Sequence, residues 1–295
     1  MLIDFVGLGS MGLGMATSLL KAGYDVRGYD PDVARVEMLC AQGGVAYTGA
    51  KELQADAIVC VVLNADQTRD ILFGEHGVAA QLCKGGLIIS CATVSPAFAS
   101  EMEFEAVTHG LLYLDAPISG GAIKAAEGRL SIMASGTVEA FTAADPLLNA
   151  MSETIHRLGD RAGPGSAMKA VNQLLAGVHI AAMGEALAFS VSQGLDPARV
   201  VDVISASAGT SWMFENRAPH VVESDYSPRS KIDIWLKDLG IVTDIGASSG
   251  LPLPISSNAL IQFRSASDAG LGQEDDAAIA KYFARAGGVI MPGDY

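Results

Sequence analysis

Two polar side chains in the second half of the chain, Lys169 and Asn172, have the types and the spacing that proton transfer needs. Residues three apart in a helix share one face, so the ammonium and the amide would project together. A partly desolvated lysine can exchange a proton with a hydroxyl or carbonyl oxygen, whereas most lysines are solvated at the surface. The spacing alone leaves both interpretations of Lys169 open.

A second polar segment, residues 115–121, follows a short apolar run and ends in Ser119, Gly120 and Gly121. A serine hydroxyl beside unhindered backbone N–H groups can bind a carboxylate, and an ordinary loop is the alternative. Lys237 and Asp238, on a later helix, are either a solvated pair or a polar contact that reaches into the cleft.

Near the N-terminus, an apolar run at residues 2–6 leads into a G-x-G-x-x-G loop and then into a helical pattern. The loop residues are Gly7, Leu8, Gly9, Ser10, Met11 and Gly12. Gly7 permits the tight turn, Gly9 lets the backbone approach a pyrophosphate, and Gly12 lets helix and strand pack closely. The alternative is that these glycines form only a tight βα turn.

A second apolar run ends at Asp30, where a Rossmann unit carries the acid that accepts the ribose 2′-OH. A carboxylate here would repel a 2′-phosphate, so the sequence predicts NAD rather than NADP. Arg27 and Arg35 lie near in sequence and would soften that repulsion if they reached the phosphate.

The elements expected to hold these residues alternate along the first half of the chain. Strands are expected at 2–6, 24–29, 57–63, 86–91, 111–114 and 130–135, with helices at 10–22, 31–42, 66–73 and 95–108. Such alternation predicts an α/β Rossmann domain with a parallel sheet over residues 1–162. An all-α domain, serving substrate binding and oligomerisation, is expected over 163–295.

The stretch 166–192 is rich in Ala, Leu, Val and Met and contains no proline, which predicts a helix about 40 Å long. Lys169, Gln173 and Glu185 interrupt its apolar surface, which argues against a membrane span. A helix with so much apolar circumference predicts burial by other helices, including those of a second subunit, in a homodimer or homotetramer.

Composition narrows the function further. A net charge of −14 leaves no basic face for nucleic acid, and the five histidines have no metal-ligand spacing, so no metal is expected. The four cysteines all lie in the first third of the chain without C-x-x-C spacing, which predicts buried, reduced thiols. Met1 leads directly into the first strand, so we expect a cytoplasmic protein.

Taken in order, these motifs resemble the β-hydroxyacid dehydrogenase family, and the resemblance covers nearly the whole chain. It implies that Lys169 is the general acid/base and that Asn172 is a hydrogen-bond partner of a small hydroxyacid substrate. It gives the substrate carboxylate to residues 119–121, and it places Lys237 beside both substrate and nicotinamide. It also adds Leu63, Asn64, Thr93 and Asp238 to the NAD site.

One residue departs from the family pattern: Gln173 stands where a second asparagine is usual. Within the family, the segment 212–220 most resembles the branch that acts on L-threonate and related four-carbon sugar acids. Its Asn216, Arg217 and His220 are then expected to bind the distal hydroxyls, or the segment only packs against a neighbouring subunit. The alternatives are a dehydrogenase for 3-hydroxyisobutyrate, a reductase for tartronate semialdehyde, glyoxylate or succinic semialdehyde, an imine reductase, or a non-catalytic dinucleotide-binding protein.

Overall fold

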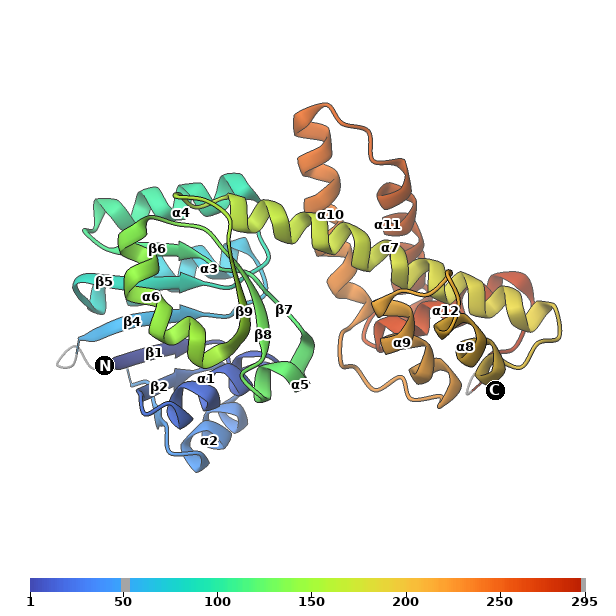
Figure 1. The fold of residues 1–295 in the computed structure, drawn as a ribbon, viewed down its shortest axis with the longest axis horizontal. Helices are drawn as coiled ribbons and strands as arrows, with labels where there is room; N and C mark the ends of the chain where they lie inside the picture. Colours follow the sequence, from blue (N-terminus) through green and yellow to red (C-terminus); the bar gives the residue numbers. More distant parts are fainter. Residues whose placement is uncertain (49–53, 293–295) are drawn as a thin grey trace. The chain divides into compact units, whose positions relative to one another are not determined.

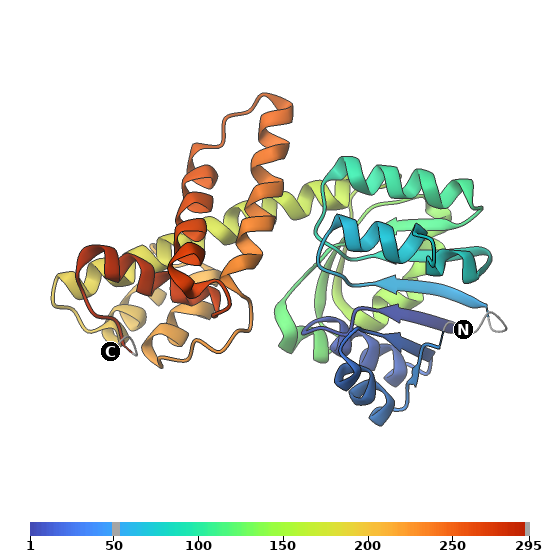
Figure 2. The same cartoon turned by 180° about the vertical axis from the view of Figure 1, so that it is seen from behind.

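The computed structural model describes residues 1–48 and 54–292, and the chain forms two compact units, Met1–Lys169 and Ala170–Tyr295. Figures 1 and 2 show the ribbon from opposite sides. The division falls within helix α7 (Pro164–Ser192), beyond the boundary at residue 162 that we expected from the sequence. The first residues of α7 belong to the first unit, and Gly165 N and Ser166 N are hydrogen-bonded to Ser135 and Asp115 there.

The first unit is built on a six-stranded sheet. Its strands are β1 (Leu2–Val6), β2 (Asp25–Tyr29), β3 (Val45–Ala46), β4 (Ala55–Cys60), β5 (Leu82–Ser90) and β6 (Leu112–Asp115). They lie in the order β3-β2-β1-β4-β5-β6, with each neighbouring pair parallel. This is the strand order of the doubly wound Rossmann fold, which binds its ligand outside the carboxyl ends of the strands where the order reverses. In this sheet that point lies between β1 and β4.

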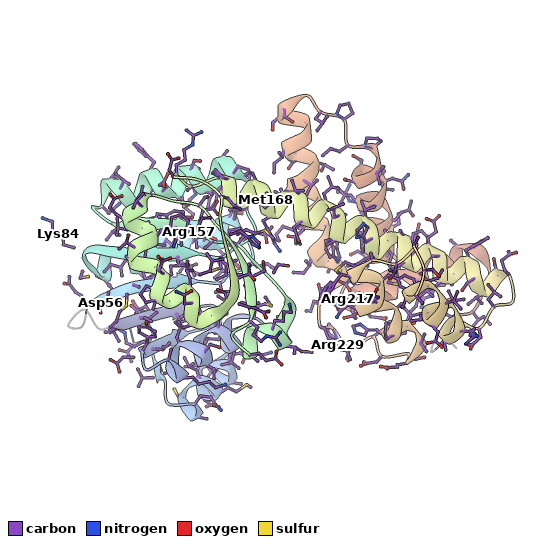
Figure 3. All side chains as sticks on the ribbon, in the orientation of Figure 1. Asp56, Lys84, Arg157, Met168, Arg217 and Arg229 are labelled. Atoms are coloured by element: carbon purple, nitrogen blue, oxygen red, sulfur yellow. The ribbon has the colours of Figure 1, made fainter. Side chains whose placement is uncertain are left out.

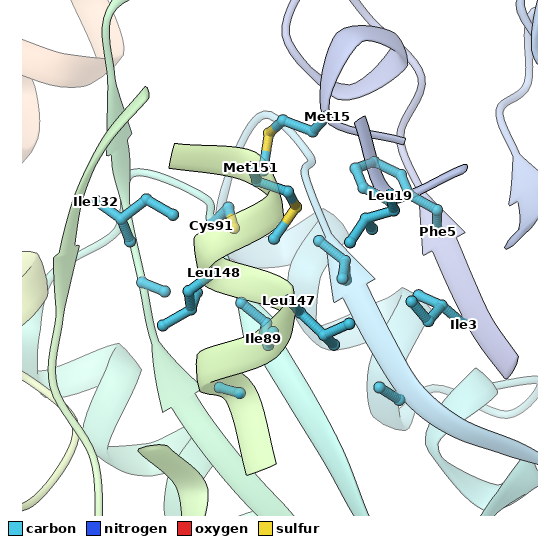
Figure 4. Close-up of a cluster of buried hydrophobic side chains, with 14 of the residues drawn as sticks. Ile3, Phe5, Met15, Leu19, Ile89, Cys91, Ile132, Leu147, Leu148 and Met151 are labelled. Atoms are coloured by element: carbon cyan, nitrogen blue, oxygen red, sulfur yellow. The ribbon is translucent and has the colours of Figure 1, made fainter. Parts of the chain in front are cut away.

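Helices cover both faces of this sheet because the strand side chains alternate between two apolar cores. Ile3, Phe5 and Ile89 belong to one core, together with Met15 and Leu147 from helices α1 (Gly12–Lys21) and α6 (Val138–Met151), as Figure 4 shows. The opposite core combines Ile58, Cys60 and Ile88 with residues of α3 (Ala65–Phe73) and α4 (Pro96–Thr108). Among the described residues, the other helices of the unit are α2 (Val33–Ala41), α5 (Gly121–Ala126) and the 3₁₀ turn η1 (Val78–Gln81).

The strand expected at 130–135 lies outside the main sheet. As β8 (Leu130–Ala134), it pairs antiparallel with β7 (Ile118–Ser119) and parallel with β9 (Ser152–Arg157) in a separate three-stranded sheet. The sixth strand of the main sheet is instead β3, whose two residues are too short to give an apolar pattern. The expectation of six parallel strands was right in number and wrong in this one member.

The described part of the second unit, residues 170–292, contains helices and no strand. After α7 come α8 (Pro197–Ser205), α9 (Trp212–Val222), α10 (Ile232–Ser249), α11 (Pro254–Ala266) and α12 (Ile279–Gly287), with short turns η2 (Ser267–Leu271) and η3 (Asp276–Ala278). Ile180, Met183 and Leu187 of α7 enter its core. The stacked rings of Trp235 and Phe263, with centroids 5.7 Å apart, join α10 to α11 there.

By length and composition, helix α7 is long and apolar enough to cross a membrane. In its most apolar 18-residue stretch, 44% of the residues are buried inside the protein. The core helix of a globular unit meets the same test, and its buried residues occupy the apolar core just described. Three apolar side chains of α7 remain at least half-exposed: Val171, Leu175 and Phe189.

Candidate active site

The glycine loop between β1 and α1 has the geometry that a pyrophosphate requires. Gly7 has φ +90°, and a Cβ there would lie 2.1 Å from the Val61 carbonyl oxygen. At Gly12 a Cβ would lie 1.9 Å from the Gly7 oxygen, so only glycine lets helix and strand approach. Gly9 faces open space, and the cap residue Met11 gives α1 no side-chain hydrogen bond. The first N–H groups of α1 therefore suit a phosphate.

Asp30, after β2, is held by two backbone N–H groups. Leu8 N donates to its Oδ2 at 2.7 Å, and Asp32 N donates to its Oδ1 at 2.9 Å. The bond from Leu8 N holds Asp30 next to the glycine loop. These residues fit the adenosine half of NAD, with the carboxylate fixed to accept a ribose hydroxyl.

Arg27 does not serve the role we considered for it. Its guanidinium lies in the sheet and binds Asp4 through two hydrogen bonds, 2.6 Å from Nε and 2.9 Å from Nη2. Both residues are buried, at 8% and 1% exposure. A guanidinium held in a buried ion pair is expected to stay there, because leaving would strand the Asp4 carboxylate. Arg35, weakly paired with Asp32 at 3.8 Å, is the remaining cation near Asp30 of the two that we considered.

The other predicted NAD contacts follow β4 and β5, the strands next to β1 along the same sheet. Leu63 is half-exposed, and its N–H donates to Gln67 Oε1 at 3.0 Å. Asn64 caps α3 by accepting from Gln67 N at 2.9 Å. Thr93, after β5, is partly buried. Parallel strands end at one edge of the sheet, so these residues share that edge with the glycine loop.

Lys169 is buried in the first unit, with only 7% exposure. Its Nζ donates to the Ile118 carbonyl oxygen at 2.9 Å, next to Ser119 in β7. The structure therefore brings the lysine to the segment that contains Ser119, Gly120 and Gly121. Gly120, with φ +137°, lies beside the stem of Lys124, a cation that the sequence motifs do not include.

Asp115 lies at the end of β6 and is 1% exposed. Its carboxylate accepts hydrogen bonds from Ser166 Oγ at 2.7 Å, Ser166 N at 2.8 Å, Gly163 N at 3.0 Å and Ser135 Oγ at 3.2 Å. Burial raises the pKa of Asp115 above its ordinary value, and these hydrogen bonds act in the opposite direction. From the sequence, Asp115 was only the first residue of the polar segment 115–121.

In the second unit, four of the predicted polar residues form one chain of contacts. Asn172 Nδ2 donates to Gln173 Oε1 at 2.9 Å, and Gln173 Nε2 donates to Asp238 Oδ2. Lys237 Nζ lies 2.6 Å from Asp238 Oδ1. Gln173 is 8% exposed and Asp238 is 4% exposed. The departure from the family pattern thus links Asn172 to the Lys237–Asp238 pair through a single amide.

The residues expected to bind distal hydroxyls are engaged elsewhere in this unit. Arg217, labelled in Figure 3, donates from Nε to Asp276 Oδ1 at 2.6 Å. His220 Nδ1 lies 2.9 Å from Asp275 Oδ1. Both carboxylates are fully buried, so we assign these side chains to the packing of α9 against η3 rather than to substrate. Asn216 lies beside Arg217 and contacts its guanidinium.

Within the described residues, no group of three or more His, Cys, Asp or Glu side chains is placed to hold a metal ion. The cysteines are free thiols. Cys60 and Cys91 are buried as expected. Cys40, near the end of α2, is exposed, and Cys83, at the start of β5, is partly exposed. Burial raises the pKa of the Cys60 thiol to about 12.

Comparison with known proteins agrees with this geometry. Residues 2–159 match the NAD-binding domain of 6-phosphogluconate dehydrogenase, and residues 163–283 match the NAD-binding domain of NADP-dependent 3-hydroxyisobutyrate dehydrogenase. The L-threonate dehydrogenase of Cupriavidus necator is 46% identical, covering 99% of this chain and 98% of that one. The L-threonate dehydrogenase of Escherichia coli K12 is 44% identical, covering 99% and 96%. A crystal structure of 3-hydroxyisobutyrate dehydrogenase from Salmonella typhimurium is 45% identical, with a TM-score of 0.91 and coverage of 96% and 99%.

A Rossmann unit with this glycine loop, followed by a helical unit, defines a dehydrogenase of the nicotinamide-dependent class. The chain belongs to the β-hydroxyacid dehydrogenase family. It is an NAD-dependent oxidoreductase that acts on the CH–OH group of a small hydroxyacid. The fold and family expected from the sequence are confirmed.

Proposed function

We propose that this enzyme oxidises L-threonate, or a closely related four-carbon sugar acid, to the corresponding oxo acid. The observation that carries the proposal is identity of 44–46% along 99% of the chain to proteins named L-threonate dehydrogenase. The related structure named 3-hydroxyisobutyrate dehydrogenase supplies the second candidate substrate. The two substrates differ in polarity, because L-threonate carries several hydroxyls and 3-hydroxyisobutyrate carries one.

Lys169 is the proposed general acid/base. In the oxidation direction its Nζ, in the neutral form, takes the proton from the reacting hydroxyl, and in reduction it returns that proton to the carbonyl oxygen. The hydrogen bond to the Ile118 oxygen fixes the nitrogen, which is what a proton-transfer group needs. Asn172, three residues later in α7, is the proposed hydrogen-bond partner of the same oxygen.

Bound NAD would supply the hydride acceptor for this oxidation. The proposed residues for it are the loop 7–12 and Asp30 at the adenosine and pyrophosphate end, with Leu63, Asn64 and Thr93 along the sheet edge. Lys237 and Asp238 are proposed for the nicotinamide end. Asp30, held by Leu8 N and Asp32 N, orients the ribose, and the N-terminus of α1 offsets the pyrophosphate charge.

The substrate carboxylate is proposed to bind Ser119, Gly120 and Gly121. Their segment begins one residue after Ile118, whose carbonyl oxygen accepts from Lys169, so a carboxylate there would place the neighbouring carbons within reach of Nζ. Lys237 is the proposed cation for this anion. Its ammonium is paired with Asp238 at 2.6 Å, which holds it in one orientation.

The test is a comparison of kcat/KM for NAD reduction with L-threonate, its stereoisomers and 3-hydroxyisobutyrate. A site built to hydrogen-bond hydroxyls rejects an analogue that lacks them by up to about 10⁴-fold, because its buried polar groups lose their partners. We expect L-threonate to be preferred by a wide margin and the stereoisomers to be separated. Comparable values for L-threonate and 3-hydroxyisobutyrate would refute the four-carbon assignment and leave the hydroxyacid class.

We further propose that residues 1–162 serve NAD binding and that 163–295 serve substrate binding and oligomerisation in a cytoplasmic homodimer or homotetramer. The exposed Val171, Leu175 and Phe189 of α7, and Ile255 of α11 at 70% exposure, support a subunit interface over the helical unit. Light scattering at micromolar concentration tests this: a multiple of the 30.5 kDa chain mass is expected, and a monomer mass would refute it.

A further inference from the structure

We propose that Asp115 is a positioning residue: its buried carboxylate fixes the first turn of α7 and thereby the place of Lys169. This inference rests on the proposed role of Lys169 as the acid/base group. It assigns a function to a residue that the substrate loop and the NAD site leave unused.

The carboxylate sits at the point where α7 begins. Helix N-termini leave their first N–H groups without intrahelical partners, and a buried helix start must find acceptors for them. Asp115 Oδ2 accepts from Gly163 N and Ser166 N, at 3.0 and 2.8 Å, and Oδ1 accepts from Ser166 Oγ at 2.7 Å. Negative charge at this end also favours the helix dipole.

Ser135 extends the same network to the second sheet. Its Oγ donates to Asp115 Oδ2 at 3.2 Å and accepts from Gly165 N at 2.8 Å. The backbones of Asp115 and Ser135 pair as well, at 3.0 and 2.8 Å. The backbone of Gly165 packs tightly against β8, because a Cβ on Gly165 would lie 2.5 Å from the Met133 oxygen. The first turn of α7 is therefore locked against the ends of β6 and β8.

Lys169 is fixed both through its backbone, in the first turns of α7, and through its side chain, at Ile118. Its backbone follows Ser166 by three residues, about 4.5 Å along the helix axis. Its Nζ donates to the oxygen of Ile118, which follows Asp115 by three residues in the chain. Removing the carboxylate takes away three of the hydrogen bonds that fix the backbone end, whereas the bond from Gly165 N to Ser135 remains. A shift of about 1 Å in a reacting group can cost about 100-fold in rate.

The test compares Asp115→Asn with Asp4→Asn in the full-length enzyme. Asp4 is a matched control, because it is another 1% exposed carboxylate of the same unit, it accepts two hydrogen bonds, and its partner Arg27 lies far from α7 in the sequence. Kinetics use NAD and the best hydroxyacid of the panel above, and Lys169→Met sets the rate without the acid/base group. Asp115→Asn is expected to lower kcat by about 10- to 100-fold with KM for NAD unchanged.

A second readout follows Lys169 itself. Acetylation of Lys169 by acetic anhydride, measured by mass spectrometry against the exposed Lys84 labelled in Figure 3, is expected to accelerate in Asp115→Asn and not in Asp4→Asn. If Asp115→Asn does not fold, Ser166→Ala decides the question, because it removes only the 2.7 Å hydroxyl contact. That variant is then expected to lower kcat by up to about 10-fold with KM for NAD unchanged.

The outcomes separate the two proposals. An active Lys169→Met would overturn the acid/base assignment itself. An inactive Lys169→Met, together with a folded Asp115→Asn that keeps both the wild-type kcat and the wild-type labelling of Lys169, would overturn the positioning role alone. Equal losses of kcat in Asp115→Asn and Asp4→Asn would likewise reduce Asp115 to a purely structural residue.

Discussion

Replacing Gln173 tests how the helical unit holds its polar residues. The side chain uses both ends of its amide: Oε1 accepts from Asn172 at 2.9 Å, and Nε2 donates to Asp238. Gln173→Leu keeps the approximate volume and removes both contacts. Gln173→Asn restores the usual family residue but is one methylene too short to make both.

The magnitude follows from the charge and burial of Asp238. A hydrogen bond to a charged group contributes about 1.5–3 kcal/mol, and Asp238 is 4% exposed. The ion pair between Lys237 and Asp238 remains after the substitution, because Lys237 Nζ contacts Oδ1 whereas Gln173 contacts Oδ2. We therefore expect Gln173→Leu to lower the free energy of unfolding by about 2 kcal/mol. If Lys237 and Asn172 act in the transition state, kcat/KM falls by about 10- to 30-fold.

Urea unfolding and steady-state kinetics measure the two effects. Gln173→Glu should be worse than Gln173→Leu at neutral pH, because it sets a second carboxylate against Asp238, and it should recover as the pH falls. Gln193→Leu, an exposed glutamine one residue beyond α7, is the control and should change neither quantity. A Gln173→Leu enzyme with wild-type stability and wild-type kcat/KM would refute the reasoning.

Two further predictions concern the first unit. Asp30→Ala should bring kcat/KM for NADP close to that for NAD, because it removes the carboxylate that opposes a 2′-phosphate, while Arg27 stays paired with Asp4; wild-type enzyme that prefers NADP would contradict this. Burial raises the pKa of Cys60 to about 12, whereas the pKa of a cysteine in the unfolded chain is about 8.5. The stability contributed by the neutral thiol is therefore fully present below pH 8.5 and is lost as the pH rises towards 12. Relative to Cys60→Ala, wild type should lose about 1.4 kcal/mol of unfolding free energy per pH unit above 8.5, and parallel urea midpoints for the two proteins between pH 8 and 10.5 would count against it.

The sequence predicted most where the information is local. The glycine loop, Asp30 and the alternating strands follow from neighbouring residues. Five of the six expected strands lie in the main sheet, and Asp30 is bonded to the glycine loop. Helix α6 was missed because Pro146 lies inside it, and β3 was missed because it has only two residues. Two residues give no periodic pattern, whereas the buried apolar residues of α6, from Ala140 to Met151, do have helical spacing that the proline interrupts.

Contacts between distant segments account for the rest of what the sequence did not give. The pairing of Arg27 with Asp4 depends on strand register, and the pairing of Arg217 with Asp276 joins residues 59 apart. Asp115 collects hydrogen bonds from residues 20 to 51 positions away, which no local pattern encodes. The sequence shows that a residue is charged, and only the fold shows which hydrogen-bond or ion-pair partner it contacts.

The most direct test of the account is the turnover of Lys169→Met. Removing a positioned acid/base group typically lowers the rate by about 10²–10⁴-fold, and the NAD-binding loop lies in a different part of the same unit. We predict that Lys169→Met binds NADH with wild-type affinity, measured by fluorescence titration, and loses at least 10²-fold in kcat with L-threonate. A variant that binds NADH normally and keeps more than about a tenth of the wild-type kcat would show that another group transfers the proton.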